Sequence, residues 1–246
     1  MKVPLLPSPH YNQNPSTMPL KAPYQKKLGK RGHIHIWQVD GNLIRSTFDP
    51  EFTNFGQHFH FHYIPEYELW LDQELVRDER RFFIDHLLTE WKLMKQGIPY
   101  ETAIVAADIK EKTERYCSQK IKKLTEKIEN FDINKLHLKL LGGTKTKLSV
   151  WSIDGCLVRT LFFIDFTEGG HRYVYDFVPE NEVWIDNDLV TEEIPFVLLH
   201  ELHERKLMKK LGWEYHRAHR HASRLEWLCR QGKKIVTVEL KKLGWE

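Results

Sequence analysis

The side chains with the clearest capacity for chemistry lie in the sequence HELHE at residues 200–204. The surrounding stretch is apolar with the period of a helix, and residues four apart in a helix share one face. His200 and Glu204 are therefore expected on a core-facing stripe beside Phe196 and Leu207. Polar groups on such a stripe destabilise a fold by roughly several kcal/mol unless they are satisfied. A metal ion bound by both side chains would satisfy them together.

This spacing resembles the H-E-x-x-H helix of the zincin metallopeptidases, with Glu204 in the place of the second histidine. In zincins the two residues four apart hold zinc, and the intervening glutamate polarises the bound water. The resemblance implies Zn²⁺ as cofactor, His200 and Glu204 as ligands, Glu201 as general base, and a peptide as the default substrate. Zinc accepts imidazole nitrogen and carboxylate oxygen at similar distances of about 2.0–2.2 Å, so the replacement is chemically tolerable.

The next helical stretch offers a third ligand. One of its faces carries Tyr215, Ala218, His219, Ala222 and Glu226. Two alanines allow close approach to the preceding helix, and His219 falls between them. We therefore expect His219 to be the third ligand. Glu226 either fixes the tautomer of a ligating imidazole or is itself the ligand.

The chain contains an internal repeat at an offset of 114 residues. The sequence IWQVDGNLIR at residues 36–45 recurs as VWSIDGCLVR at 150–159, and KLMK occurs at both 92–95 and 206–209. Such self-similarity indicates a tandem duplication. We predict a degenerate first copy at 32–142 and a second copy at 143–246. Residues 1–31 are Pro-rich and polar, which predicts a flexible tail.

The first copy serves as an internal control. It keeps the ligand pair as His86 and Glu90, but Leu87 stands at the position of the base and Ile104 at that of the third ligand. The joint loss of both groups favours a metal site in the second copy alone. The alternative is that the retained His–Glu pair is a buried hydrogen-bonded pair in both copies, in which case the other histidines are incidental.

Water activation is the simplest chemistry for such a site. An oxyanion formed from a carbonyl substrate would be stabilised by Tyr215, His203 or His171. The sequence does not choose among these three side chains. His171 is replaced by Gln57 in the first copy, so it is present only together with the other second-copy residues.

The pattern predicts an α+β fold, in which each copy has a small antiparallel sheet followed by two packed helices. Alternating apolar residues around Asp40-Gly41 and Asp154-Gly155 indicate hairpin turns. The expected helices cover about 190–211 and 214–231, with counterparts at about 76–96 and 99–128. Each copy is expected to end in a strand, at about 136–140 and 235–240.

A weaker metal signal lies in the first copy, where His58, His60 and His62 alternate with aromatic residues. Period-two spacing places the three histidines on one face of a strand. The second copy lacks them but keeps the aromatic side, which favours a solvent-facing position for the histidines.

Composition narrows the function classes. A net charge of +3 is too small to indicate nucleic-acid binding alone, although basic residues cluster at 21–31 and 110–147. No apolar run reaches the roughly 20 residues of a membrane span, and residues 1–31 lack the apolar core of a signal peptide. Three scattered cysteines favour a reducing cytoplasm. The competing function is a non-enzymatic scaffold that binds nucleic acid or a protein partner.

Overall fold

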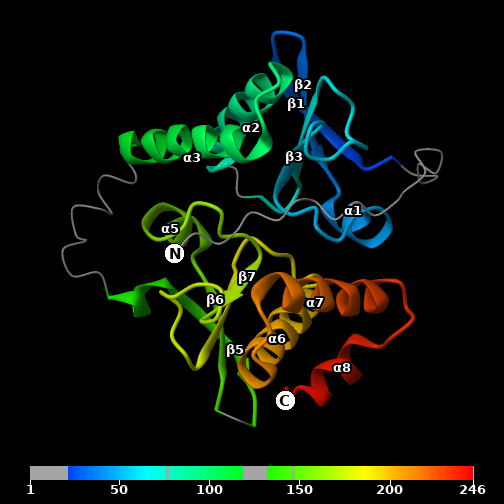
Figure 1. Cartoon of the computed structure of the whole chain (residues 1–246), viewed down its shortest axis with the longest axis vertical. Helices are drawn as coiled ribbons and strands as arrows, with labels where there is room; N and C mark the ends of the chain where they lie inside the picture. The colour runs from blue at the N-terminus through cyan, green and yellow to red at the C-terminus, as the bar shows by residue number, and fades with distance from the viewer. Residues whose placement is uncertain (1–21, 76–77, 119–131, 146, 246) are drawn as a thin grey trace. The chain divides into compact units, whose positions relative to one another are not determined.

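The computed structural model describes residues 22–75, 78–118, 132–145 and 147–245. The chain forms two compact units, Met1–Asn130 and Phe131–Glu246, here called unit 1 and unit 2. The boundary lies between Asn130 and Phe131, earlier in the chain than the 142/143 boundary expected from the repeat. Each unit contains a four-stranded sheet followed by a pair of helices (Figure 1). The predicted α+β class and the duplicated unit are confirmed.

The two sheets have the same strand order. Unit 1 has the order β1-β2-β4-β3, and unit 2 has β5-β6-β8-β7. The strands of unit 1 are β1 (Tyr24–Arg31), β2 (Ile34–Val39), β3 (Phe55–Gln57) and β4 (Glu68–Asp72). Those of unit 2 are β5 (His137–Gly143), β6 (Ser149–Ile153), β7 (Gly169–His171) and β8 (Glu182–Asp186).

The sheets are mixed, so the expectation of purely antiparallel sheets was wrong. β2 and β4 run parallel, as do β6 and β8, whereas the outer pairs are antiparallel. A parallel pair cannot be joined by a tight turn and requires a crossover. The crossover contains a short helix, α1 (Gly41–Thr47) in unit 1 and α5 (Gly155–Leu161) in unit 2.

The Asp-Gly pairs begin these helices and do not form hairpin turns. The Asp40 carboxylate accepts the backbone N–H of Leu43, and Asp154 accepts that of Leu157. Aspartate is a favoured N-cap because its oxygen satisfies an otherwise unpaired N–H of the first turn. The Asp-Gly pairs therefore do mark a change of local structure, but that change is the start of a helix and not a hairpin turn.

The hairpin of each unit lies earlier than expected. β1 pairs with β2, so residues 24–31 belong to the sheet and not to a flexible tail; residues 1–21 lie outside the described residues. β1 is an edge strand ordered by backbone pairing, and its side chains are half-buried or exposed. Because its sequence is polar, β1 could not be recognised as a strand from apolar alternation. β5, expected to end the first copy, is the corresponding edge strand of unit 2.

The predicted helix pairs are present in both units. Unit 1 has α2 (Arg80–Lys95) and α3 (Tyr100–Cys117), and unit 2 has α6 (Ile194–Leu211) and α7 (Tyr215–Arg230). The expected extension of α3 to residue 128 lies outside the described residues. In unit 2, α6 packs on β7 and β8 through a core that includes Val183, Ile185 and Val197.

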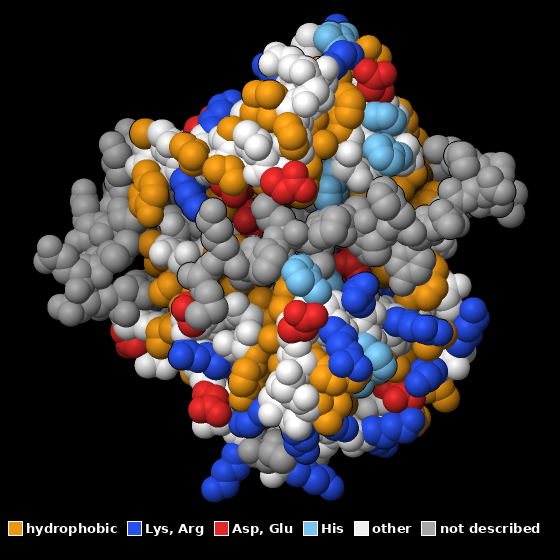
Figure 2. All heavy atoms as spheres, viewed as in Figure 1, with side chains coloured by type: hydrophobic (Ala, Val, Ile, Leu, Met, Phe, Trp, Pro, Cys, Tyr) orange, Lys and Arg blue, Asp and Glu red, His pale blue; other side chains and the backbone are white. Residues whose placement is uncertain are grey.

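Two further short elements occur in unit 2. η2 (Ile133–Leu136) is a 3-10 turn before β5, and α8 (Val236–Lys242) is a helix where a final strand was expected. Ile235 and Val238, which suggested strand alternation, are 65% and 44% exposed, and Leu240 is the buried anchor. The alternating apolar residues therefore do not form a core face. Lysine and arginine side chains gather over α7 and α8 (Figure 2).

Among the described residues, no helix is long and apolar enough to cross a lipid bilayer. All three cysteines, Cys117, Cys156 and Cys229, are free thiols.

Candidate metal centre

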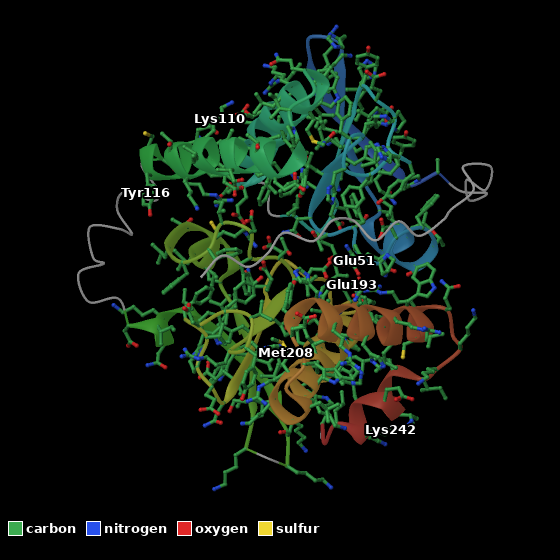
Figure 3. All side chains as sticks on the ribbon, viewed as in Figure 1. Glu51, Lys110, Tyr116, Glu193, Met208 and Lys242 are labelled. Atoms are coloured by element: carbon green, nitrogen blue, oxygen red, sulfur yellow. The ribbon has the colours of Figure 1, made fainter. Side chains whose placement is uncertain are left out.

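The centre lies where α6 and α7 cross. Ala218 and Ala222 are fully buried between the two helices. Because the distance between packed helices depends on the side chains at their contact, two alanines bring the backbones close. His219 lies between them in sequence and reaches α6. Glu193 marks the start of α6 and Met208 lies near its end (Figure 3).

The three residues predicted as ligands are together. His200 Nε2 lies 3.1 Å from His219 Nδ1 and 3.5 Å from Glu204 Oε2, and His219 Nδ1 lies 2.9 Å from Glu204 Oε2. Tetrahedral ligands at about 2.1 Å from zinc are about 3.4 Å apart. Small shifts would therefore let the three atoms share one ion. The side chains of His200 and His219 are 12% and 16% exposed, so solvent can reach the centre.

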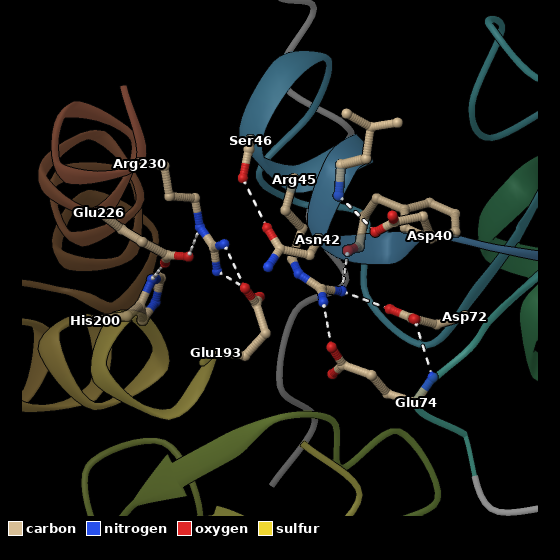
Figure 4. Close-up of polar contacts among 12 residues, drawn as sticks. Asp40, Asn42, Arg45, Ser46, Asp72, Glu74, Glu193, His200, Glu226 and Arg230 are labelled. Carbon is tan, nitrogen blue, oxygen red and sulfur yellow. Dashed lines mark hydrogen bonds and ion pairs between the residues drawn. The ribbon is translucent and has the colours of Figure 1, made fainter. Parts of the chain in front are cut away.

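A buried chain of charges orients His200 (Figure 4). Its Nδ1 lies 3.0 Å from Glu226 Oε2, and Glu226 Oε1 accepts the Nε–H of Arg230 at 2.8 Å. Arg230 then donates both terminal nitrogens to the two oxygens of Glu193. A proton on Nδ1, held by Glu226, leaves Nε2 with the lone pair that a ligand needs. Both oxygens of Glu226 are engaged, which favours the orienting role over that of ligand.

His171 faces the other oxygen of Glu204. Its Nε2 lies 3.1 Å from Glu204 Oε1, although without the angle of a good hydrogen bond. Its Nδ1 accepts the backbone N–H of Tyr173 at 3.2 Å. A neutral imidazole that accepts at Nδ1 carries its proton on Nε2. His171, Glu201 and Glu204 also place ligand atoms within 4.8 Å of one another, but a proton on Nε2, the atom that faces Glu204, makes His171 a poor ligand.

Unit 1 supports this assignment for His171. There the side chain of Gln57 donates Nε2–H to Glu90 Oε1 at 2.5 Å and accepts the backbone N–H of Phe59 at 2.7 Å. Gln57 thus makes the same two contacts as its counterpart in unit 2. His171 and Gln57 both position a glutamate, so the histidine is not specific to the metal hypothesis.

The charge chain itself is also common to both units. His86 Nδ1 lies 3.0 Å from Glu111, and Arg115 joins Glu111 to Glu79. His86 Nε2 lies 3.4 Å from Glu90. Unit 1 therefore fits the alternative of a buried His–Glu pair, with His86 held by ion pairs to Glu90 and Glu111.

The charge chain and the His–Glu pair that both units contain are here called the frame. The two units differ in the side chains around this frame. Ile104 and Leu87, at the positions of His219 and Glu201, are buried apolar residues. Unit 1 thus fills with hydrocarbon the space in which unit 2 places an imidazole and a carboxyl group. The buried charge chain is present in both units, and the imidazole of His219 and the carboxyl group of Glu201 are particular to unit 2.

The electrostatics of the centre favour a cation. Burial alone would lower the pKa of His200, but hydrogen bonds to Glu204 and Glu226 outweigh burial and raise it well above its usual value. Burial would raise the pKa of Glu204, but contacts with three histidines hold it well below its usual range. Without a metal, His200 is therefore a protonated cation between two carboxylates. A metal ion would have to displace that proton.

Glu201 lies on the side of α6 that contacts β7. A Cβ at Gly169 would be 3.1 Å from its Cγ, so the glycine makes room for this side chain. Burial and the neighbouring charge of Glu204 raise the pKa of Glu201 to about 8. In the metal-free protein this carboxyl group is therefore mostly protonated at neutral pH, and a cation bound beside it would favour the carboxylate form.

The other two predicted catalytic residues have different positions. His203 Nε2 lies 2.9 Å from His221 Nδ1, so it belongs to a separate histidine pair; burial and His221 lower its pKa to about 4. The ring of Tyr215 lies 5.4 Å from that of His219. Of the two, only Tyr215 lies against a candidate ligand.

Sequence reasoning missed Tyr175. A Cβ at Gly170 would meet its ring at 2.5 Å, and Phe61 packs in the same way over Gly56 in unit 1. Burial raises the pKa of the Tyr175 hydroxyl well above its usual value, with further contributions from Tyr215 and Glu201. The available signal was the replacement of Phe61 by Tyr175 at the repeat offset.

The charge chain was missed as well. Neither Glu193 nor Arg230 is among the residues predicted for the site. The available signal was that both recur in the first copy, as Glu79 and Arg115. Charged residues retained in both copies indicated a buried pair.

The expected histidine strand in unit 1 does not form. β3 ends at Gln57, and the following residues turn. His58 Nδ1 lies 2.7 Å from the Ile64 carbonyl oxygen, and the ring of His60 stacks on Tyr100. Within the described residues these histidines form no metal-ligand group.

Comparison of the chain with family models, curated proteins and solved structures gave no match. The functional interpretation therefore rests on the geometry of the centre.

Proposed function

We propose that unit 2 is a metal-dependent, peptidase-like hydrolase whose zinc ion is held by His200, Glu204 and His219. The observation that carries the proposal is the convergence of three ligand atoms within 3.5 Å of one another. The contrast with Ile104 in unit 1 supports it, because the same frame exists there without a third ligand. Two histidines and a carboxylate are a known catalytic zinc set that leaves a position for water.

Each neighbouring side chain then has a distinct task. A zinc ion bound here would supply water with a pKa near about 7 and would polarise a carbonyl group. Glu201 would be placed to accept a proton from that water. Glu226 and His171 hold His200 and Glu204 in their ligating orientations. Tyr215 is the candidate hydrogen-bond donor to an oxyanion.

A peptide substrate is proposed from the zincin resemblance. β7 is the outermost strand beside α6, and Glu201 packs against its first residue, Gly169. All three residues of β7 are buried, so pairing of an extended peptide with this edge is not part of the proposal.

The metal content of the purified chain tests this function. We expect about one zinc per chain in the wild type and none in the double variant His200→Ala/His219→Ala. His203→Ala is the matched control, because it removes an imidazole from the same helix pair but outside the centre. Absence of metal from wild-type protein supplied with zinc would overturn the proposal.

The second candidate function is a non-enzymatic duplicated scaffold for nucleic acid or a protein partner. The observation in its favour is that unit 1 builds the complete charge chain around His86 without a third ligand. For this function we expect no metal in the wild type or in the His200→Ala/His219→Ala variant. We also expect steeply salt-dependent binding to DNA or RNA.

A further inference from the structure

A hollow of about 110 Å³ lies in unit 2 between α6, α8 and the turn that joins β5 to β6. Its floor is apolar and includes Leu148 and Leu202, which belong to the core. Five cationic side chains line it, here called the cationic rim: Arg205, Lys206, Lys209, Lys210 and Lys242. No acidic side chain is among the lining residues.

Only part of this positive charge is neutralised by the protein. Lys209 pairs with Glu180 and Lys242 with Glu239, both at the surface. Lys206 and Lys210 form no ion pair within the described residues. The rim therefore includes ammonium groups whose mutual repulsion a bound anion would relieve.

Arg205 adds a positive charge to the rim. One of its terminal nitrogens donates to the Glu180 carbonyl oxygen, and its guanidinium carbon lies 5.5 Å from the ring of Tyr173. No carboxylate of the described residues pairs with this guanidinium group, so its charge adds to that of the lysines.

Unit 1 has no such arrangement at the corresponding position. Trp91 stands where unit 2 has Arg205, and it is buried against Tyr67 and Phe59. Gln96 takes the position of Lys210. Lys206 and Lys209 have lysine counterparts in Lys92 and Lys95, and the positions equivalent to α8 lie outside the described residues. The difference between the units is therefore the replacement of Arg205 by a buried Trp91 and of Lys210 by Gln96.

We infer that the cationic rim binds a phosphate group. Lysine and arginine together offer the charge-assisted donors that phosphate oxygens require. Since a water molecule occupies about 30 Å³ of liquid, the hollow has room for one small oxyanion. The group could be carried by a small phosphomonoester or by the backbone of a nucleic acid, which share this chemistry. This inference goes beyond the proposed hydrolase and does not depend on it.

Calorimetric titration of the full chain with inorganic phosphate, at constant ionic strength, tests the inference. We expect saturable binding that Lys206→Ala/Lys210→Ala weakens by at least about tenfold, because charge-assisted contacts are lost. The matched control is Lys92→Ala/Lys95→Ala, which removes two lysines from α2 of unit 1. It should leave the affinity unchanged. Both substitutions concern exposed side chains, and equal thermal unfolding midpoints would verify folding.

A second arm distinguishes the source of the phosphate. Binding of a single-stranded oligonucleotide that falls steeply with salt, and that phosphate displaces, supports a nucleic-acid backbone. Oligonucleotide binding no tighter than that of phosphate supports a small phosphomonoester. Absence of saturable phosphate binding, or equal weakening in the control, overturns the inference. His200→Ala/His219→Ala should bind phosphate normally, so failure of the hydrolase proposal would be separately visible.

Discussion

At the residue scale, the two units differ by a few side chains set on one frame. His200 and His86 occupy the same position between two glutamates. Only His200 has a neighbouring imidazole, that of His219. The sequence predicted this convergence from helical spacing alone. It could not assign the tautomer of His171, because that depends on a backbone N–H contact from Tyr173.

Glu201→Gln separates catalysis from metal binding. The amide keeps the size of the carboxyl group but cannot accept the proton of bound water. We expect turnover to fall by about a hundredfold or more, with the zinc on His200, Glu204 and His219 retained. Parallel measurements of metal content and activity check this. Loss of that zinc in the variant would show that Glu201 is a ligand and not a base.

Metal affinity should increase with pH. The pKa of His200 lies well above its usual value of 6.5 in the metal-free protein, so metal has to displace a proton throughout the neutral range. One displaced proton corresponds to about a tenfold gain in affinity per pH unit. Zinc dissociation constants at about pH 6, 7 and 8 would reveal this slope. A constant affinity would contradict the protonated state of His200.

His171→Gln should be nearly neutral for metal binding. Gln57 already makes both equivalent contacts in unit 1, so the amide can position Glu204 in the same way. His171→Leu removes the donor and should weaken zinc binding by roughly tenfold or more. Zinc titration of both variants checks the assignment. If the glutamine variant loses zinc as fully as a ligand variant does, then His171 is a ligand.

At the element scale, the long helices were predictable and the short elements were not. α6 and α7 carry periodic apolar faces over several turns, which is the strongest sequence signal. β1 and β5 are edge strands with mostly polar or exposed side chains. Backbone hydrogen bonds to the neighbouring strand hold them in place, and burial of side chains contributes little. α8 has Leu240 as its single buried residue and therefore shows no helical face. The fold class followed from the sequence, but the mixed sheet order required the coordinates.

The α2–α3 crossing should accept a metal centre by substitution. Ala103 and Ala107 flank Ile104 and are fully buried, as the two alanines around His219 are. In the His200→Ala/His219→Ala background, Ile104→His should therefore restore zinc binding through His86 and Glu90. Metal content and circular dichroism would be measured together. A folded variant that binds no zinc would show that the shared frame is insufficient.

At the scale of the whole molecule, each unit has its own sheet, core and buried charge chain. The stability of unit 1 depends on a histidine that is protonated when folded. Hydrogen bonds to Glu111 and Glu90 outweigh the opposing effect of burial and raise the pKa of His86 to about 10. The free energy of unfolding of this unit is thereby linked to pH, with no metal involved.

The sign of this linkage is definite. Because the folded pKa exceeds the unfolded value of about 6.5, the stabilisation is fully present below about pH 6.5 and is lost as pH rises to about 10. We expect a loss on the order of a few kcal/mol in urea unfolding over this range. His86→Gln should remove the contribution of unit 1 to the profile and leave that of His200 in unit 2. A wild-type unfolding free energy that stays constant from about pH 7 to 10 would contradict this charge state.

The most direct test of the central claim is the zinc content of the full chain and of its His219→Ile variant. Isoleucine occupies the equivalent position in unit 1 and is buried there without disturbing the frame, so the variant should fold. We expect about one zinc per chain in the wild type and none in the variant after identical dialysis. Zinc-free wild-type protein, or a variant that retains the ion, would contradict a centre built from His200, Glu204 and His219.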